Sequence, residues 1–260
     1  MNYIEDFYTN NCDEEARLGY RHNSVEFLTT MRYIKKYLQP SSHVLEIGAG
    51  SGRYSRAIAD MGNPVHAVEL VPHNIEVFKS LLTSSQNIQI AQGNALDLNM
   101  LKDNTFDITL MLGPMYHLYT EADKLQALSE ALRVTKPGGV IFVAYVISDG
   151  ALLENLEASW FLDYIAKGKI DPITFATTSN PEDIFELVRK EDIDRLMTQF
   201  NVKRLHYVAT NMISRFIRQT LTNISDELFD IYLRFHFSVC ERPDMVGVTN
   251  HSLDVFRKSL

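Results

Sequence analysis

The stretch "SSHVLEIGAGSGRYSRAIADMG", Ser41 to Gly62, joins an apolar run to an amphipathic run through a turn rich in glycine. Gly48, Gly50 and Gly52 fall within five positions. Ordering glycine costs more backbone entropy than ordering other residues, so this density indicates positive φ angles or close approach to a ligand. A strand, a tight turn and a helix N-terminus together suit a nucleotide-like ligand, whose polar groups the backbone N–H groups can meet.

The glycine spacing differs from two other nucleotide-binding patterns. The dinucleotide fingerprint G-x-G-x-x-G needs its third glycine one residue later, where this chain has Arg53. The phosphate-binding pattern G-x-x-x-x-G-K-[ST] is absent from the sequence. We therefore do not expect NAD or ATP to be the ligand of this turn.

Short apolar runs alternate with helical patterns along the chain. The runs predict strands at His43–Gly48, Pro64–Leu70, Asn87–Gln92, Phe106–Leu112, Gly139–Ile147, Val202–Thr210 and His251–Lys258. Apolar residues between them recur at helical spacing, as in Tyr54, Ala57, Ile58 and Met61. This alternation predicts an α/β fold, with a mostly parallel sheet and helices on both faces, in a single domain over residues 1–260.

Two segments lie outside the regular alternation. Residues 1–40 are expected to form an N-terminal helical cap, whose apolar stripe includes Phe27, Met31 and Ile34. Residues 150–201 are too long for an ordinary connection. They include a predicted helix, Ala151–Lys169, and the aromatic residues Trp160, Phe161, Tyr164 and Phe175. We expect this insertion to be a lid over the substrate; the alternative is ordinary crossover helices packed on the sheet.

Composition limits the classes of partner. The longest apolar run, Val140 to Ile147, has eight residues, too few to span a bilayer. The acidic N-terminus does not resemble a signal peptide, and Cys12 and Cys240 form no ligand spacing, so a cytoplasmic location is expected. The formal net charge of −8 disfavours nucleic acid, and no membrane partner is expected.

Five motifs in order resemble the class I S-adenosylmethionine-dependent methyltransferases. They are "VLEIGAGSGRYS", "VHAVEL", "QGNALDL", "FDITLMLGPMYHL" and "LRVTKPGGVIFV". The resemblance implies a Rossmann-like sheet of seven strands, the last antiparallel, and S-adenosylmethionine as cofactor. The first motif places Ala49 with Gly48, Gly50 and Gly52 at the cofactor.

Two acidic residues are candidates for cofactor binding. Glu69 ends the second predicted strand, and its carboxylate could accept hydrogen bonds from both ribose hydroxyls; Leu70 follows it. The alternative for Glu69 is an exposed charge at a strand end. Glu46 lies inside an apolar strand, where a carboxylate needs partners, and we expect these to be N–H groups of the glycine turn.

The next two strands are followed by further candidates. Asn94 and Ala95 stand where family members contact adenine, although Asp97 is a rival and a loop cap is the alternative. Leu112 and Gly113 are expected beside the methionine portion. Tyr116 and His117 could face the acceptor, and His117 is the best-placed general base; the alternative is a packed histidine bonded to a backbone carbonyl.

The remaining expectations concern the cofactor carboxylate, metals and the reaction. Arg17 or Tyr20 could fold over the carboxylate, or could belong to a solvated helix lead-in. The eight histidines show no metal-ligand spacing. The sequence therefore predicts methyl transfer to a small-molecule acceptor. An RNA or protein methyltransferase and a non-catalytic binding protein remain the alternatives, because one fold serves many substrates.

Overall fold

The computed structural model describes residues 3–12, 19–156 and 160–260, and within these ranges one eight-stranded sheet organises the chain. The strand order is β3-β2-β1-β4-β5-β8-β7, with β6 paired to β5. The strands are β1 (Val44–Ile47), β2 (Val65–Glu69), β3 (Ile88–Gln92), β4 (Phe106–Met111), β5 (Thr135–Ile147), β6 (Leu187–Val188), β7 (Val202–Ala209) and β8 (His251–Lys258). The predicted α/β fold is confirmed. The seven expected strands are present, and the two-residue strand β6 is an eighth that was not predicted.

All neighbouring strands are parallel except at β8, which lies antiparallel between β5 and β7. The last strand is therefore reversed, as the resemblance implied. Because β1 and β4 are neighbours while β2 and β3 extend to the other side, the strand order changes direction next to β1. Open α/β sheets bind ligands at such a position, outside the carboxyl ends of the strands.

Both faces of the sheet are buried. Successive strand residues point to opposite sides, so buried neighbours along one strand pack on different faces. In β5, Ile141 and Val143 pack in one apolar cluster, while Val140 and Phe142 pack in the other. Helices α6 (Glu121–Val134) and α9 (Lys190–Met197) contribute to the first cluster. Helices α3 (Arg21–Tyr37), α4 (Arg53–Ala59) and α12 (Pro243–Val246) contribute to the second. Helix α5 (Pro72–Ser80) adds Phe78 to a smaller cluster beside the glycine turn.

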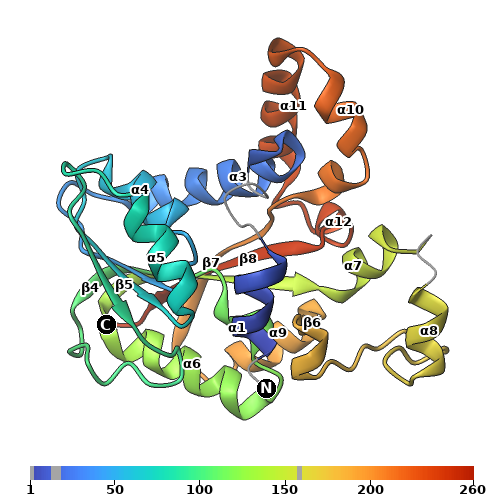
Figure 1. The fold of residues 1–260 in the computed structure, drawn as a ribbon, viewed down its shortest axis with the longest axis horizontal. Coiled ribbons are helices and arrows are strands. Elements are labelled where there is room, and N and C mark those ends of the chain that lie inside the picture. The colour runs from blue at the N-terminus through green and yellow to red at the C-terminus, as the bar shows by residue number, and fades with distance from the viewer. Residues whose placement is uncertain (1–2, 13–18, 157–159) are drawn as a thin grey trace.

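The N-terminal segment forms α1 (Tyr3–Asp6) and the π-helix η1 (Phe7–Asn11), which lie within the predicted cap 1–40 although no apolar stripe marked either one. Figure 1 shows α1 lying in front of the sheet. In space, η1 contacts α5, and α1 contacts the short η3 (Pro181–Asp183) of the insertion. The beginning of the chain therefore lies against the middle of the sequence.

The insertion differs from the predicted single helix Ala151–Lys169. Helix α7 (Ser148–Glu154) ends at Asn155, and a separate helix, α8 (Trp160–Ala166), follows. Gly168, at φ +70°, ends the second helix as expected, since its N–H bonds the carbonyl of Ile165 at 3.0 Å. The insertion also supplies η3, β6 and α9, so it extends from the rim of the molecule back to the sheet.

Two other boundaries differ from the sequence patterns. The "KPGG" motif, Lys136 to Gly139, lies inside β5 and does not separate α6 from it, because α6 already ends at Val134. The apolar residues Ile213, Phe216, Ile217 and Leu221 recur at helical spacing, but their segment is divided into the 3-10 helix η4 (Met212–Arg215) and α10 (Arg218–Asn223). Helix α11 (Asp226–Val239) is capped by Ser225, whose side chain accepts from the N–H of Leu228. Figure 1 shows α10 and α11 projecting from the body.

No helix in the described ranges is long and apolar enough to cross a membrane.

Candidate functional site

The turn between β1 and α4 requires all three of its glycines. Gly48, Gly50 and Gly52 have φ angles of +71°, +56° and +77°, in the left-handed region that disfavours other residues. A Cβ on Gly48 would lie 2.7 Å from Pro114, and one on Gly52 would lie 2.1 Å from Phe78. A Cβ on Gly50 would meet nothing within 4 Å. This last position keeps open a space that a ligand can enter.

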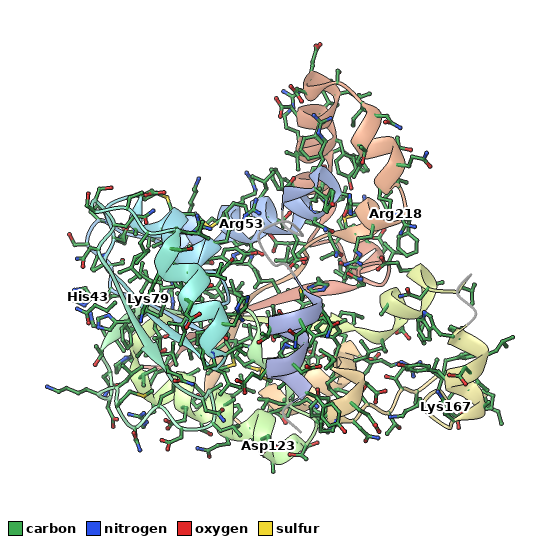
Figure 2. The ribbon with its side chains drawn as sticks, viewed as in Figure 1. His43, Arg53, Lys79, Asp123, Lys167 and Arg218 are labelled. Carbon is green, nitrogen blue, oxygen red and sulfur yellow. The ribbon has the colours of Figure 1, made fainter. Side chains whose placement is uncertain are left out.

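That space belongs to a cavity of about 350 Å³ at the carboxyl ends of β1, β2 and β4. Its wall includes the predicted residues Glu46, Gly48, Ala49, Gly50, Glu69, Leu70, Asn94, Ala95, Leu112, Gly113, Tyr116 and His117. Figure 2 labels Arg53 on α4 and Asp123 on α6, whose side chains also line this cavity. The fold therefore brings together four separate segments that the sequence motifs indicated, and the fifth motif contributes no residue to this wall.

Glu69 is buried and already has partners, contrary to the alternative of an exposed charge. Its Oε2 accepts from the N–H of Gly50 at 2.8 Å. Its Oε1 accepts from the N–H of Val71 at 2.9 Å and from the side-chain amide of Asn74 at 3.2 Å. A carboxylate offers about four lone-pair positions, and these described partners use three. Glu69 thus holds the glycine turn and retains acceptor capacity for one further donor.

Glu46 is also buried, but its partner differs from the expected one. Its Oε2 accepts from the N–H of Ser55 at 2.9 Å and from the Ser55 hydroxyl. Ser55 lies in the first turn of α4 and not in the glycine turn, because the strand directs Glu46 beneath the helix N-terminus. Burial raises the pKa of Glu46 to about 8 despite the two bonds from Ser55, and the nearby Glu69 raises it further.

Of the three candidates in the loop after β3, two line the cavity and one does not. Asn94 and Ala95 line the cavity, and Asn94 Oδ1 accepts from the N–H of Leu96 at 3.0 Å. Asp97 accepts from the backbone and side-chain amides of Asn99, at 3.1 and 3.3 Å, and is not among the lining residues. Asp97 thus acts as a loop cap, while Asn94 combines a turn contact with a place on the cavity wall.

Tyr116 and His117 lie in the 3-10 helix η2 (Pro114–His117), which directly follows β4. The Tyr116 hydroxyl donates to the carbonyl of Leu112 at 2.8 Å. His117 Nδ1 lies 2.8 Å from the carbonyl oxygen of Ile184, and its Nε2 lies 2.9 Å from the hydroxyl of Tyr8. His117 therefore contacts a backbone carbonyl, as in the alternative of a packed histidine, and it also lines the cavity.

The expected clamp over the cofactor carboxylate does not form at Tyr20. This side chain is exposed, lies 5.8 Å from the His22 ring, centroid to centroid, and is not among the lining residues. Arg17 lies outside the described residues. From the same region it is Glu26, on α3, that lines the cavity, and its Oε1 lies 3.4 Å from His251 Nδ1.

Sequence reasoning missed other members of the wall, above all Tyr8 and Asn74. No local signal marked Tyr8, because the N-terminal helices carry no clear apolar stripe. Asn74 has a position that was visible in the sequence, five residues after Glu69, at the start of the helix that follows β2. Among the described residues, no group of three or more His, Cys, Asp or Glu side chains is arranged to hold a metal ion.

A second cavity, of about 630 Å³, lies against the first, and Tyr8 and Tyr116 line both. Beside polar and charged residues, its wall includes the aromatic side chains of Phe7, Tyr8, Tyr116, Trp160, Tyr164 and Phe185. Of the aromatic residues expected in a lid, Phe161 is buried with Leu152 and Ile170, and Phe175 is exposed. The insertion therefore forms the wall of the second cavity and not of the first.

Comparison with known proteins identifies the family. Residues 45–143, from β1 to β5, match the model of a methyltransferase domain. These residues are a class I methyltransferase domain. The glycine turn, Glu69 and the loop after β3 all lie within the matched range. The resemblance drawn from the sequence motifs is thereby confirmed, and with it S-adenosylmethionine as the family's methyl donor.

The names of two relatives of the methyltransferase domain refer to small molecules. A ubiquinone biosynthesis O-methyltransferase of Cereibacter sphaeroides is 26% identical over 153 residues, which cover 58% of this chain and 60% of that protein. A 2-methyl-6-phytyl-1,4-hydroquinone methyltransferase of Synechocystis is 32% identical over 108 residues, 41% of this chain and 33% of that protein. The chain thus aligns with only part of the length of these relatives.

Solved structures extend the likeness to the whole fold. The CcbJ methyltransferase of Streptomyces caelestis superposes with a TM-score of 0.62 over 100% of this chain and 99% of that chain. The sequence identity is 13%, so the agreement concerns the fold. Because this alignment covers the whole chain, the likeness in fold includes β7, β8 and the insertion.

Proposed function

We propose that this protein transfers a methyl group from S-adenosylmethionine to a small-molecule acceptor. The observation that carries the proposal is the glycine turn, whose open side at Gly50 faces the same cavity as Glu69. A Cβ at that position would occupy the cavity, so the missing side chain fits a bound group. The acid beside it fits a ligand that brings hydroxyl donors.

The residues present suit each portion of the cofactor. Glu69 and Leu70 would hold the ribose, with Glu69 supplying the acceptor capacity that its own partners leave. Asn94 and Ala95 would meet the adenine edge, while Leu112, Gly113 and Glu46 would border the methionine portion. Bound in this way, the cofactor would supply a methyl group that is attached to a positively charged sulfur. After the transfer this sulfur is left as a neutral thioether.

The second cavity would then hold the acceptor. It meets the first at Tyr8 and Tyr116, so an acceptor there would lie next to the methyl donor. The protein's contribution is to align the two reactants and to exclude water, since methyl transfer is an in-line displacement. The insertion over residues 150–201 supports this assignment, because Trp160 and Tyr164 come from it.

A small-molecule acceptor is favoured over RNA or protein. The relatives' names point to quinone-type compounds. The formal net charge of −8 gives no electrostatic attraction for a polyanion. The acceptor cavity combines aromatic with polar side chains, as expected for a small molecule that has a ring and a polar group.

Calorimetry with S-adenosylhomocysteine, and with NAD as comparison, tests the cofactor. We expect binding of the first and none of the second. Gly50→Ala should weaken binding, because its methyl group would enter the cavity. Gly62→Ala is the matched control: Gly62 also has a positive φ, +88°, and no atom within 4 Å of its Cβ position, but lies outside the cavity wall.

Labelled S-adenosylmethionine tests the reaction. We expect label to pass into a metabolite extract and not into an RNA or protein pool. Transfer into RNA or protein would replace the small-molecule assignment. Binding of S-adenosylhomocysteine without transfer to any pool would favour a non-catalytic binding protein. Tight binding of NAD alone would overturn the assignment of the cavity.

A further inference from the structure

The wall shared by the two cavities carries a pair of side chains from opposite parts of the sequence. Tyr8, in η1, lines both cavities, and His117, in η2, lines the first. The Tyr8 hydroxyl lies 2.9 Å from His117 Nε2. Their ring centroids are 5.6 Å apart with an edge-on arrangement. The pair therefore stands between the predicted cofactor and acceptor positions.

The partner of the other ring nitrogen determines the tautomer of His117. Its Nδ1 lies 2.8 Å from the carbonyl oxygen of Ile184, which can only accept a hydrogen bond. Nδ1 therefore carries the hydrogen. In the neutral ring Nε2 is then an acceptor, and the hydrogen between it and Tyr8 comes from the phenol. His117 is thus oriented to take up a proton from the direction of Tyr8.

The insertion holds the Ile184 carbonyl in place at a conformational cost. Ile184 has φ +66° and ψ −47°, a conformation that a β-branched residue rarely adopts. The Tyr119 hydroxyl donates to the same carbonyl at 2.7 Å. The next residues are anchored as well, because the Glu186 N–H bonds the Tyr116 carbonyl at 2.8 Å and the Glu186 carboxylate pairs with Lys124. Strained backbone of this kind concentrates at functional sites.

We propose that Tyr8 and His117 form a proton relay that deprotonates a hydroxyl group of the acceptor; the inference rests on the proposed methyl transfer. The acceptor O–H would donate to the Tyr8 oxygen while the Tyr8 O–H donates to His117 Nε2. In the relay the acceptor O–H and the Tyr8 O–H bonds break, and new O–H and N–H bonds form at Tyr8 and His117. The proton resides on His117, whose Nδ1–H remains bonded to Ile184.

The second cavity indicates which hydroxyl compounds the relay serves. Among its described lining residues, Lys169 pairs with Asp183 at 2.5 Å and Arg215 pairs with Glu154 at 2.6 Å. Because these charges are paired within the protein, they offer little attraction to a charged acceptor. The aromatic wall suits a ring. A phenol combines an uncharged ring with a hydroxyl proton that must leave for efficient methylation, whereas a neutral amine needs no base before transfer.

The groups that surround His117 are compatible with a positive charge on its ring. Tyr8 approaches from η1, Tyr116 from η2 itself and Phe185 from the insertion, all as aromatic rings. Within the insertion, Asp183 pairs with Lys169, and Glu186 pairs with Lys124. Burial and these two carboxylates raise the pKa of Tyr119 to about 12, so it remains a hydrogen-bond donor to Ile184.

The ionisation of bound 4-nitrophenol tests the relay without any turnover. The phenolate absorbs visible light, so its titration can be followed with the protein in excess, with and without S-adenosylhomocysteine. We expect the bound phenol to ionise with a dissociation constant about tenfold higher than in solution. Tyr8→Phe and His117→Gln should each abolish this shift. The glutamine can still donate to the Ile184 carbonyl, but its amide does not take up a proton.

Control measurements separate the relay from the other proposals. Tyr3→Phe removes an exposed tyrosine hydroxyl from the adjoining helix α1 and should leave the shift unchanged. Calorimetry of all variants with S-adenosylhomocysteine measures cofactor binding. If the wild-type protein does not bind this compound, the proposed function is wrong and the relay is not the cause. An unchanged shift in Tyr8→Phe or His117→Gln would overturn the relay. Absence of nitrophenol binding to the wild-type protein would overturn the phenol acceptor.

Discussion

Glu46 makes stability depend on pH in an unusual direction for a carboxyl group. Its folded pKa of about 8 lies above the ordinary value of 4.5 because the side chain is buried. Between these values the native state retains a proton that the unfolded state releases. Stability is therefore lost as pH rises through this window, by a few kcal/mol in total.

Glu46→Gln should remove this dependence. The amide oxygen can still accept from Ser55, and no charge is buried at high pH. We expect the variant to unfold at a higher temperature than wild type at pH 8 and to match it near pH 5. Exposed Glu76 provides the control, since Glu76→Gln should keep the wild-type slope. Thermal denaturation across the pH range measures this; equal slopes for wild type and Glu46→Gln would refute it.

Glu69 links ligand affinity to the stability of the glycine turn. Glu69 accepts from the backbone of Gly50 and Val71, so it supports the local fold as well as the cavity wall. Glu69→Ala leaves these N–H groups without an acceptor, at a cost of about 1–3 kcal/mol in unfolding free energy. We expect weaker binding of S-adenosylhomocysteine together with this loss, measured by calorimetry and urea denaturation. Wild-type affinity would exclude the ribose role.

Helix α11 is attached to α3 by a buried histidine. His236 Nε2 lies 2.9 Å from the Thr29 hydroxyl, which donates to the Val25 carbonyl at 2.7 Å, so His236 is the donor to Thr29. Burial lowers the pKa of His236 to about 4. Between about pH 6.5 and 4 the unfolded state takes up a proton that the native state does not. Stability therefore falls as pH decreases through this window.

His236→Gln should flatten the acid side of the stability profile. The amide can donate to Thr29 but does not titrate, so the variant should lose about 1–2 kcal/mol less than wild type between pH 7 and 5. Urea denaturation at the two values gives the comparison. His73→Gln, at an exposed position in α5, should lose as much as wild type. The interpretation fails if His236→Gln and wild type lose equal stability.

The insertion has two parts with different expected mobility. Its second part, α9, packs Ile193 and Leu196 into the main apolar cluster beneath the sheet. Its first part forms a small separate cluster of Leu152, Phe161 and Ile170 beside the second cavity. The small cluster has few buried contacts, and such elements open at low free-energy cost. Within the predicted insertion 150–201, we therefore propose the lid role for the first part.

Amide hydrogen exchange tests this division. Peptides covering residues 160–179 should gain protection when S-adenosylhomocysteine and 4-nitrophenol bind, because the ligands fill the cavity that this part walls. Peptides covering α9 should be protected already in the free protein and should not change. The α9 peptides thus serve as the internal control. Full protection of both parts without ligands would make the insertion an ordinary crossover.

Local patterns were sufficient for the frame of the protein and for one side of its site. Strand periodicity and helix stripes depend on neighbours a few residues apart, so β1 to β5, β7 and β8 were predictable within a few positions, apart from the four residues that begin β5. The conformational demand on Gly48, Gly50 and Gly52 is likewise local, as is the place of Glu69 at the end of β2. These are the elements that form the cofactor side of the cavity.

The acceptor side depended on contacts between distant parts of the chain. Tyr8 lies 109 residues before His117, and Ile184 lies 67 residues after it. No periodic pattern connects such positions, since their meeting results from how α1, η1 and the insertion pack over the sheet edge. The partner of Glu46 and the division of the insertion are decided in the same way, by which surfaces are buried together. Local sequence therefore specified the glycine turn and the acid beside it, and packing specified which side chains meet above them.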